Sequence, residues 1–281
     1  MNFGGIYPEC SLRDALFVVV PVPYDLTSTY QPGSRRGPAA IIDASSNMEL
    51  YDDELKKETY LCGIHTALPV PVDARGPKNM ISLVHKKITR IAALNKIPVM
   101  LGGEHSISFG AVHALQKKYS KLTVLQLDAH ADLRESYQKS PYSHACVARR
   151  IAEICPLIQV GIRSMSEEEA EYLSQSNVKS YSADFVLENN DWHERICKSL
   201  SGDVYVSIDL DVFDPSIMPS TGTPEPGGLY WNNVLRLLKM VSSFCKVRGF
   251  DVVELAPLPN VVAPDFMAAK LIYRFMGYIN K

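Results

Sequence analysis

The chain has 281 residues, of which 46% are hydrophobic and 21% are charged, and its formal net charge is −2. These ordinary globular values predict one domain over residues 1–281 that buries a sizeable core without disulfides. The small net charge gives no electrostatic support for nucleic acid or an anionic membrane as the main partner. The N-terminal segment MNFGGIYPEC lacks a signal-peptide pattern, and the longest apolar run is too short to cross a membrane.

The six cysteines are scattered along the chain, without a C-x-x-C pair. This pattern is typical of reduced thiols, so we predict a cytoplasmic protein without a zinc ribbon or a redox disulfide. Cys146 lies two residues after His144, but nothing in the sequence pairs its thiol with a base, as a nucleophile requires.

Short β-branched runs alternate with amphipathic stretches along the chain. The predicted strands cover residues 16–22, 97–101, 122–128, 157–162, 178–183, 204–211 and 247–255. The predicted helices lie within residues 37–48, 79–96, 106–119, 143–154, 166–175, 191–200 and 230–244. This alternation predicts a parallel sheet with helices on both faces and right-handed crossovers. Ligands in such folds bind beyond the carboxyl ends of the strands, so the residues after each run are the candidate site.

Acids and imidazoles follow four of these runs, in the segments GGEHS, LDAHAD, DLDVFDPS and DVVELAP. The side chains concerned are His105, Asp128, His130, Asp132, Asp209, Asp211 and Glu254. Residues two apart in an extended segment face the same way, so each segment directs its side chains into one space. A cluster of unpaired carboxylates is costly because the charges repel and lose water, and metal cations remove that cost.

The predicted metal ligands are His105, Asp128, His130, Asp132, Asp209 and Asp211. Their donor atoms are oxygens and imidazole nitrogens without thiolate, which suits Mn²⁺ better than Mg²⁺, Fe²⁺, Co²⁺, Ni²⁺ or Zn²⁺. Six ligands are too many for one closed zinc site. They fit two ions about 3.5–4 Å apart that share bridging carboxylates.

Other interpretations exist for the separate motifs. A single buried Asp or His is usually structural. DLDVFD resembles a calcium loop, but Asp214 stands where that loop needs glycine. A D-x-D after a strand is also typical of phosphoaspartyl hydrolases, which would leave His105 unexplained. The joint occurrence at successive strand ends favours the metal centre. The segment TGTPEPGGL, residues 221–229, is predicted as a loop that either borders a pocket or lies on the surface.

The motifs GGEHS, DAHAD, SIDLDVFDP with TGTPEPGG, and DVVELAP together resemble those of the ureohydrolase family, which includes arginases and agmatinases. The match runs from TYQPGSRRGPAAI to AAKLIYRFMGY. It implies the arginase/deacetylase-type fold, a three-layer α/β/α domain with a mostly parallel sheet of about eight strands. It also implies two Mn²⁺ ions bridged by Asp128 and Asp209, and a homo-oligomer, a trimer or hexamer.

The resemblance implies roles for three further groups. Two cations lower the pKa of a shared water, which attacks a guanidinium carbon. Asp132 orients this water, and Glu254 binds guanidinium N–H groups through charge-assisted hydrogen bonds. His144, in the segment YSHA, passes a proton to the leaving amine.

The substrate implied by the resemblance is agmatine, hydrolysed to urea and putrescine in polyamine biosynthesis. Arginases carry an asparagine- and serine-rich stretch after DAHAD that holds a carboxylate, whereas this chain has Arg134 and Glu135 there. Ser220, where the family commonly has glycine, and the absence of an arginine after AIIDASS are further departures. Aminopropylagmatine, guanidinobutyrate and arginine stay open as substrates. Two rival functions are a non-catalytic metal-binding protein of the same fold and a phosphoester hydrolase with Arg134 and Arg163 as phosphate clamps.

Overall fold

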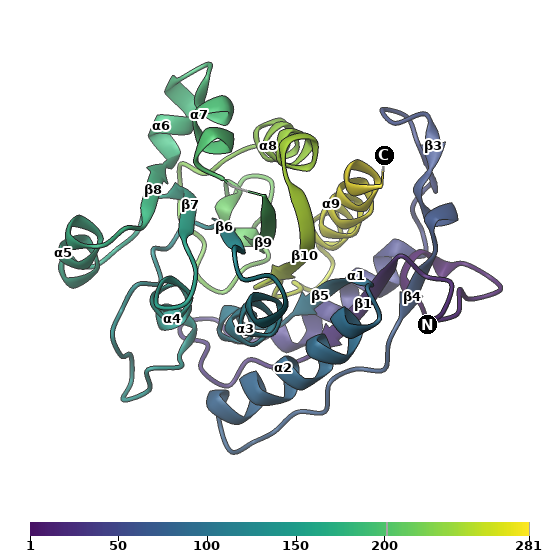
Figure 1. The fold of residues 1–281 in the computed structure, drawn as a ribbon, viewed down its shortest axis with the longest axis horizontal. Coiled ribbons are helices and arrows are strands. Elements are labelled where there is room, and N and C mark those ends of the chain that lie inside the picture. Colours follow the sequence, from purple (N-terminus) through teal and green to yellow (C-terminus); the bar gives the residue numbers. More distant parts are fainter. Residues whose placement is uncertain (201, 281) are drawn as a thin grey trace.

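One parallel sheet organises the chain in the computed structural model, which describes residues 1–200 and 202–280. The sheet has eight strands, and every neighbouring pair is parallel (Figure 1). In spatial order the strands are β4 (Ile64–Thr66), β1 (Phe17–Val22), β5 (Ile97–Gly102), β10 (Lys246–Val253), β9 (Asp203–Asp209), β6 (Thr123–Leu127), β7 (Leu157–Ile162) and β8 (Lys179–Ser182).

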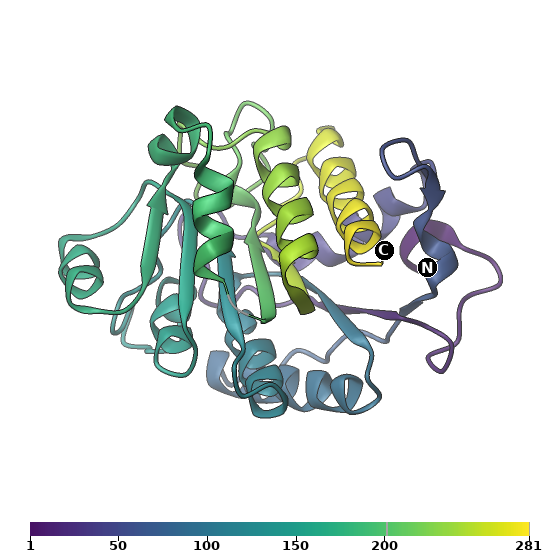
Figure 2. The same ribbon diagram turned by 45° about the horizontal axis from the view of Figure 1, so that its top comes forward.

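Helices cover both faces of the sheet, which gives the three layers seen in Figure 2. One face carries α1 (Gly37–Ser45), α6 (Ala183–Glu188), α7 (Trp192–Ser199), α8 (Trp231–Phe244) and α9 (Ala263–Ile279). The other face carries α2 (Pro77–Ala93), α3 (Ser108–Lys118), α4 (Val147–Ala152) and α5 (Glu167–Gln175). The predicted α/β/α architecture with about eight strands is therefore confirmed.

The core consists of two apolar clusters, one on each face of the sheet. Along β1, Phe17 and Val19 belong to one cluster, whereas Val18 and Val20 belong to the other. Successive side chains of a strand point to opposite faces, so a strand in the middle layer buries both sets and is mostly apolar. The β1 sequence FVVVPV is entirely buried, which explains why it shows no alternation.

Several elements were not predicted. They are β4, α6, α9 and a small hairpin of β2 (Tyr51–Asp52) and β3 (Lys57–Glu58). Strands of two or three residues are too short to show a period. Helix α9 is buried over most of its surface, so its polar face is too narrow to mark it as an amphipathic helix. Among the described residues, no helix combines the length and hydropathy needed to cross a bilayer.

Six short 3-10 helices complete the described secondary structure. They are η1 (Phe3–Gly5), η2 (Ser34–Arg36), η3 (Thr59–Cys62), η4 (His105–Ile107), η5 (His144–Cys146) and η6 (Leu210–Val212). Three of them, η4, η5 and η6, contain predicted site residues. Side chains of the candidate site are therefore presented by tight turns as well as by strand ends.

The strand order brings four strand ends together at the centre of the sheet. The chain passes from β5 to β6 over two positions that β10 and β9 fill later in the sequence. Such a reversal of winding leaves a crevice beyond the carboxyl ends of the strands, where α/β proteins bind ligands. The four strands β5, β10, β9 and β6 are those followed by the predicted acids and imidazoles, and they are consecutive neighbours.

Candidate metal centre and active site

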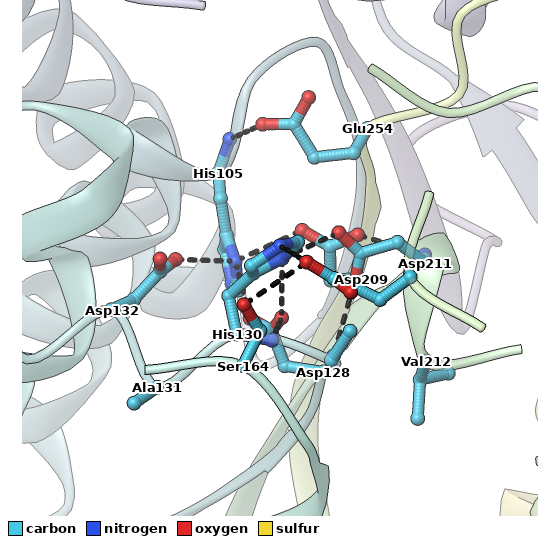
Figure 3. A network of polar contacts seen from close by, with 12 residues as sticks. His105, Asp128, His130, Ala131, Asp132, Ser164, Asp209, Asp211, Val212 and Glu254 are labelled. Carbon is cyan, nitrogen blue, oxygen red and sulfur yellow. Dashed lines mark hydrogen bonds and ion pairs between the residues drawn. The ribbon is translucent and has the colours of Figure 1, made fainter. Parts of the chain in front are cut away.

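The six predicted metal ligands converge at this crevice (Figure 3). We call them the acid–imidazole cluster: His105, Asp128, His130, Asp132, Asp209 and Asp211. Within it, one group of donor atoms comes from His105, Asp128 and Asp132. A second comes from Asp128, His130 and Asp211, and in each group all donor atoms lie within 4.8 Å of one another. Asp128 belongs to both groups, the position expected of a bridging carboxylate.

His105 is presented by η4, directly after β5. Its Nδ1 lies 3.1–3.3 Å from one carboxylate oxygen on each of three aspartates, Asp128, Asp132 and Asp209. On the other side of the ring, Nε2 lies 2.9 Å from Ser207 Oγ, which donates in turn to Asp251. The ring is therefore fixed with Nδ1 toward the acids.

The segment after β6 turns sharply to bring Asp128, His130 and Asp132 together. The Asp128 carboxylate accepts from Gln126 Nε2 at 2.7 Å and from the His130 backbone N–H at 2.6 Å. His130 forms a bridge with Ser164 outside the named strands, and Asp132 has a positive φ of 53°. Strand alternation thus explains only part of the convergence, because the β strand ends at Leu127 and Asp132 enters through a left-handed turn.

Asp209 and Asp211 also depart from the simple strand expectation. The predicted strand ran to residue 211, but β9 ends at Asp209 and Asp211 lies in η6. The Asp209 carboxylate accepts from the Asp211 backbone N–H at 2.9 Å, which caps this turn. Asp211 Oδ1 accepts from Ala129 N–H at 3.1 Å, and its Oδ2 lies 2.9 Å from His130 Nδ1. The turn therefore ties two strand ends together.

The geometry of the cluster fits divalent cations. His105 Nδ1 is a buried nitrogen that makes no hydrogen bond of good geometry with the described residues, although three carboxylates surround it. Four carboxylates and two imidazoles in a volume this small form a set of hard donors that cations satisfy and neutral groups do not. The cluster is thus suited to hold divalent cations.

The electrostatics of the cluster favour the same conclusion. Burial and the carboxylates of Asp211 and Asp132 raise the pKa of Asp128 to about 7. Burial disfavours a charged His130, but Asp211 and the other acids outweigh it and raise the pKa of His130 to about 11. Without cations, protons must therefore supply the positive charge, so cations that bind here displace protons.

Glu254 lies at the rim of the cluster. The predicted strand ran to residue 255, but β10 ends at Val253, because Glu254 has a φ of 65°. This left-handed conformation directs the side chain back over the crevice, where Oε1 accepts from the His105 backbone N–H at 2.6 Å (Figure 3). Burial and the nearby Glu104 raise the pKa of Glu254 well above its usual range. The Glu254 side chain is therefore held inside the site and not in a surface ion pair.

His144 comes from η5, far along the chain from the strand ends, yet it lines the same cavity. This cavity has a volume of about 230 Å³. Its wall includes, besides cluster residues, Ser28, Gln31, Arg134, Tyr137, His144, Glu169, Gly222, Thr223 and Glu254. Burial lowers the pKa of His144, so its imidazole is neutral at pH 7. Cys146 is not a nucleophile candidate, because burial raises the pKa of its thiol to about 11.

The loop 221–229 borders the cavity through Gly222 and Thr223, so the first of its two open interpretations is the one observed. Arg163 fixes its far side, donating to the carbonyl oxygens of Glu225 and Pro226. The same guanidinium also donates to the carbonyls of Gly161, Asp211, Val212 and Phe213. Arg163 is therefore a structural clamp whose hydrogen-bond donors are already used.

Comparison with known proteins identifies the family. A profile of the arginase family matches residues 15–277. The chain is 38% identical to an N(1)-aminopropylagmatine ureohydrolase from Synechocystis sp., over 95% of this chain and 90% of that protein. It is 36% identical to an agmatinase from Pyrococcus horikoshii, over 98% of this chain and 96% of that protein.

The chain belongs to the arginase family. Among solved structures, the agmatine ureohydrolase of Thermoplasma volcanium superposes with a TM-score of 0.89 at 35% identity, covering 96% of this chain and 92% of that one. The resemblance to the ureohydrolases drawn from the sequence motifs is therefore confirmed, as is the arginase-type fold. The family prediction holds over almost the entire chain, including the N-terminal and C-terminal segments outside the acidic motifs.

Sequence reasoning missed several polar residues beside the site, among them Glu104 and Thr27. Glu104 is fully buried next to His105, and Thr27 lies between Glu104 and His144. Glu104 carried a usable signal, because a carboxylate directly after a buried strand needs hydrogen-bond donors. Thr27 carried none, since a threonine in a loop of Ser, Thr and Tyr residues is unremarkable until the fold places it.

Proposed function

We propose that this arginase-family member is an amidinohydrolase that releases urea from a guanidino amine, agmatine or N(1)-aminopropylagmatine, with two Mn²⁺ ions. The observation that supports this most is the shared position of Asp128 in two donor groups at the base of a cavity that His144 and Glu254 also line. The enzyme names of the relatives, ureohydrolase and agmatinase, agree with this chemistry. We also expect a homo-oligomer and a cytoplasmic location.

When bound, the two cations supply a water that is deprotonated near neutral pH. The residues that would hold them are His105, Asp128, His130, Asp132, Asp209 and Asp211. Asp132 is at the edge of the cluster facing the cavity, where its carboxylate orients the attacking water. Because the cluster is at the base of the cavity, the guanidinium carbon must enter with its N–H groups toward Glu254.

Glu254 and His144 handle the substrate and its proton. The Glu254 carboxylate accepts from guanidinium N–H groups, and the His105 backbone N–H holds it in place at 2.6 Å. A neutral His144 takes a proton and delivers it to the leaving amine, which departs as the C–N bond breaks. Urea and a primary amine are the products.

The cavity wall favours a cationic substrate without a carboxylate. Arg134 is the cationic side chain among the residues that line the cavity, and its Nε lies 3.7 Å from Glu169. The Arg134 guanidinium also lies over Tyr137, 5.1 Å from the ring centre. An arginine so engaged is poorly placed to bind an amino-acid carboxylate. This argument supports agmatine or its aminopropyl derivative over arginine and guanidinobutyrate.

The test is urea release from agmatine, N(1)-aminopropylagmatine, arginine and guanidinobutyrate, each with Mn²⁺. We expect turnover of one or both of the first two. Turnover of arginine alone would contradict the substrate assignment, and no urea from any of the four would contradict the function. A generic phosphoester serves as the control for the phosphoesterase rival, which needs free basic clamps, whereas Arg163 already donates to backbone carbonyls.

A further inference from the structure

Glu104 is a buried carboxylate that the proposed mechanism does not use. Its side chain is fully buried, and its two oxygens accept from three donors. Thr27 supplies two of them, its backbone N–H at 2.5 Å and its Oγ1 at 2.6 Å. The Ser106 hydroxyl is the third. A carboxylate held by this many donors has a fixed orientation.

The backbone around Glu104 is closely packed, which fixes the point from which its side chain extends. A Cβ on the preceding Gly103 would lie 2.0 Å from the Tyr24 carbonyl oxygen. Gly103 N–H donates to Val22 O at 3.0 Å, and Glu104 N–H donates to Tyr24 O at 2.7 Å. The segment after β5 is therefore locked against the segment after β1, which carries Thr27.

Thr27 connects this carboxylate to His144. Its Oγ1 lies 3.3 Å from His144 Nδ1 and accepts from the His144 backbone N–H at 3.1 Å. A hydroxyl has one proton, and here that proton is donated to Glu104. The oxygen then presents lone pairs to the imidazole, which favours a hydrogen on the Nδ1 that faces it.

We propose that Thr27, oriented by Glu104, is a positioning residue that holds His144 in the tautomer with a protonated Nδ1 and leaves Nε2 as the basic nitrogen for the substrate. The inference rests on the proposed function, because it assigns a partner to the proton carrier of that reaction. The arrangement follows the general logic of a base that a third group orients. Neither Thr27 nor Glu104 belongs to the acid–imidazole cluster.

Ser143 offers the competing explanation. Its Oγ also lies 3.3 Å from His144 Nδ1, from within the same segment of chain. A serine hydroxyl without a fixed acceptor can rotate and donate to Nδ1, which would favour the opposite tautomer. The two hydroxyls therefore predict different consequences of removal, and the experiment must compare them.

The experiment uses the Mn²⁺-loaded protein and the guanidino amine that the wild type hydrolyses best. Four variants are compared by kcat, KM, bound Mn²⁺ per chain and melting temperature: Thr27→Val, Thr27→Ser, Ser143→Ala and Thr89→Val. Valine keeps the shape of threonine without the hydroxyl, and serine restores the hydroxyl. Thr89→Val is the matched control, because this exposed threonine is on α2, where its hydroxyl donates to the His85 carbonyl of the same helix.

We expect Thr27→Val to lower kcat by about tenfold to a hundredfold. Losses of this size are typical when a functional histidine loses the hydrogen-bond partner that orients its ring. KM and bound Mn²⁺ should stay within about twofold of wild type, and Thr27→Ser should recover most of the kcat. Thr89→Val should match wild type. A second measurement combines Thr27→Val with His144→Ala. If Thr27 acts through His144, the added valine should not reduce the residual rate further.

Three outcomes overturn the inference. They are an unchanged kcat in Thr27→Val, an equal loss when valine is added to His144→Ala, and a large loss in Ser143→Ala with none in Thr27→Val. A drop in melting temperature that Thr27→Ser also shows would assign Thr27 a structural role instead. Absence of urea release by the wild type is a separate result, which refutes the proposed function before any variant is compared.

Discussion

The acid–imidazole cluster and the cavity wall above it are built in different ways. Strand ends and the turns directly after them supply the cluster, and the sheet order brings those strands side by side. The wall comes from loops and from η5, represented by Thr223 and His144, and hydrogen bonds from Arg163 and to Thr27 hold these segments in place. Backbone pairing places the strand ends that carry the first region, and side-chain hydrogen bonds then position residues in both regions. The cluster should therefore respond to substitution through cation binding, and the wall through turnover.

The largest effect is expected in the cluster. Asp128→Ala removes the carboxylate shared by both donor groups, so we expect loss of bound Mn²⁺ and a fall in urea release of about 10³-fold or more. Metal analysis and a urea assay check this. Asp184→Ala, at an exposed position on α6, is the matched control and should keep both properties. Full Mn²⁺ occupancy in Asp128→Ala would show that the cluster is assigned wrongly.

The second effect separates the wall from the cluster. His144→Ala should keep its bound Mn²⁺ and lose about 10²–10⁴-fold in kcat, because the imidazole carries a proton and holds no cation. Metal content and steady-state kinetics on the same preparation give both values. Mn²⁺ lost in parallel with activity would place His144 among the ligands and remove the distinction between the two regions.

Removing the cations with a chelator compares the two regions through the melting temperature. Cations that bind only the folded chain stabilise it, by about 2.7 kcal/mol when free Mn²⁺ is a hundred times the Kd. A chelator should therefore lower the melting temperature of the wild type and of His144→Ala by similar amounts. Asp128→Ala should show a smaller decrease. Equal decreases in all three would mean that the stabilising ions bind elsewhere.

A moderate effect is expected at the loop 221–229. Arg163→Lys replaces a planar guanidinium, which donates to several carbonyls, with a compact ammonium group. We expect a loss of about 1–3 kcal/mol in the free energy of unfolding, since buried acceptors lose their donors. We also expect KM to rise more than kcat falls, which denaturation curves and kinetics can measure. Arg195→Lys, an exposed helix pair with Asp191, is the matched control.

The smallest effect is expected at Glu54, which is remote from both regions. Burial opposes ionisation of Glu54, but hydrogen bonds from Lys239 and Tyr278 outweigh it and lower the pKa of Glu54 below its ordinary 4.5. A lowered folded-state pKa stabilises the fold above pH 4.5, and this contribution disappears as pH falls through the folded pKa. Glu54→Gln should cost less than about 1 kcal/mol at pH 7 and less again at pH 3. Melting curves at both values test this, while urea release at pH 7 should not change.

The acid–imidazole cluster and the cavity wall also differ in how far the sequence predicts them. Apolar runs identified the central strands, because such strands are buried on both faces and consist mostly of apolar residues. The cluster followed from the position of acids after those runs. The strand ends themselves were predicted too late at Asp211 and Glu254, because the turns that stop β9 and β10 depend on a side-chain cap and on a left-handed residue.

The wall could be predicted only in part. His144 was found through family resemblance rather than through any periodic pattern, since it enters the cavity from a loop. Thr27 was missed because its importance depends on what Glu104 and His144 do when the fold brings them near. The local hydrophobic pattern predicts the strands and helices of the central sheet. Contacts between loops depend on the tertiary fold, which no short segment of sequence specifies.

The hydrogen bonds of Arg163 restrict how the substrate preference can be redesigned. Because one guanidinium fastens the loop 221–229 to the turn after β9, that backbone is tied to the turn carrying Asp211. A protein engineer who lengthens the loop to admit a bulkier amine would also disturb the cation-binding turn. Exchanging side chains such as Thr223 leaves the clamp alone. Pocket size and cation affinity can therefore be tuned separately only through side chains, and the loop length should stay fixed.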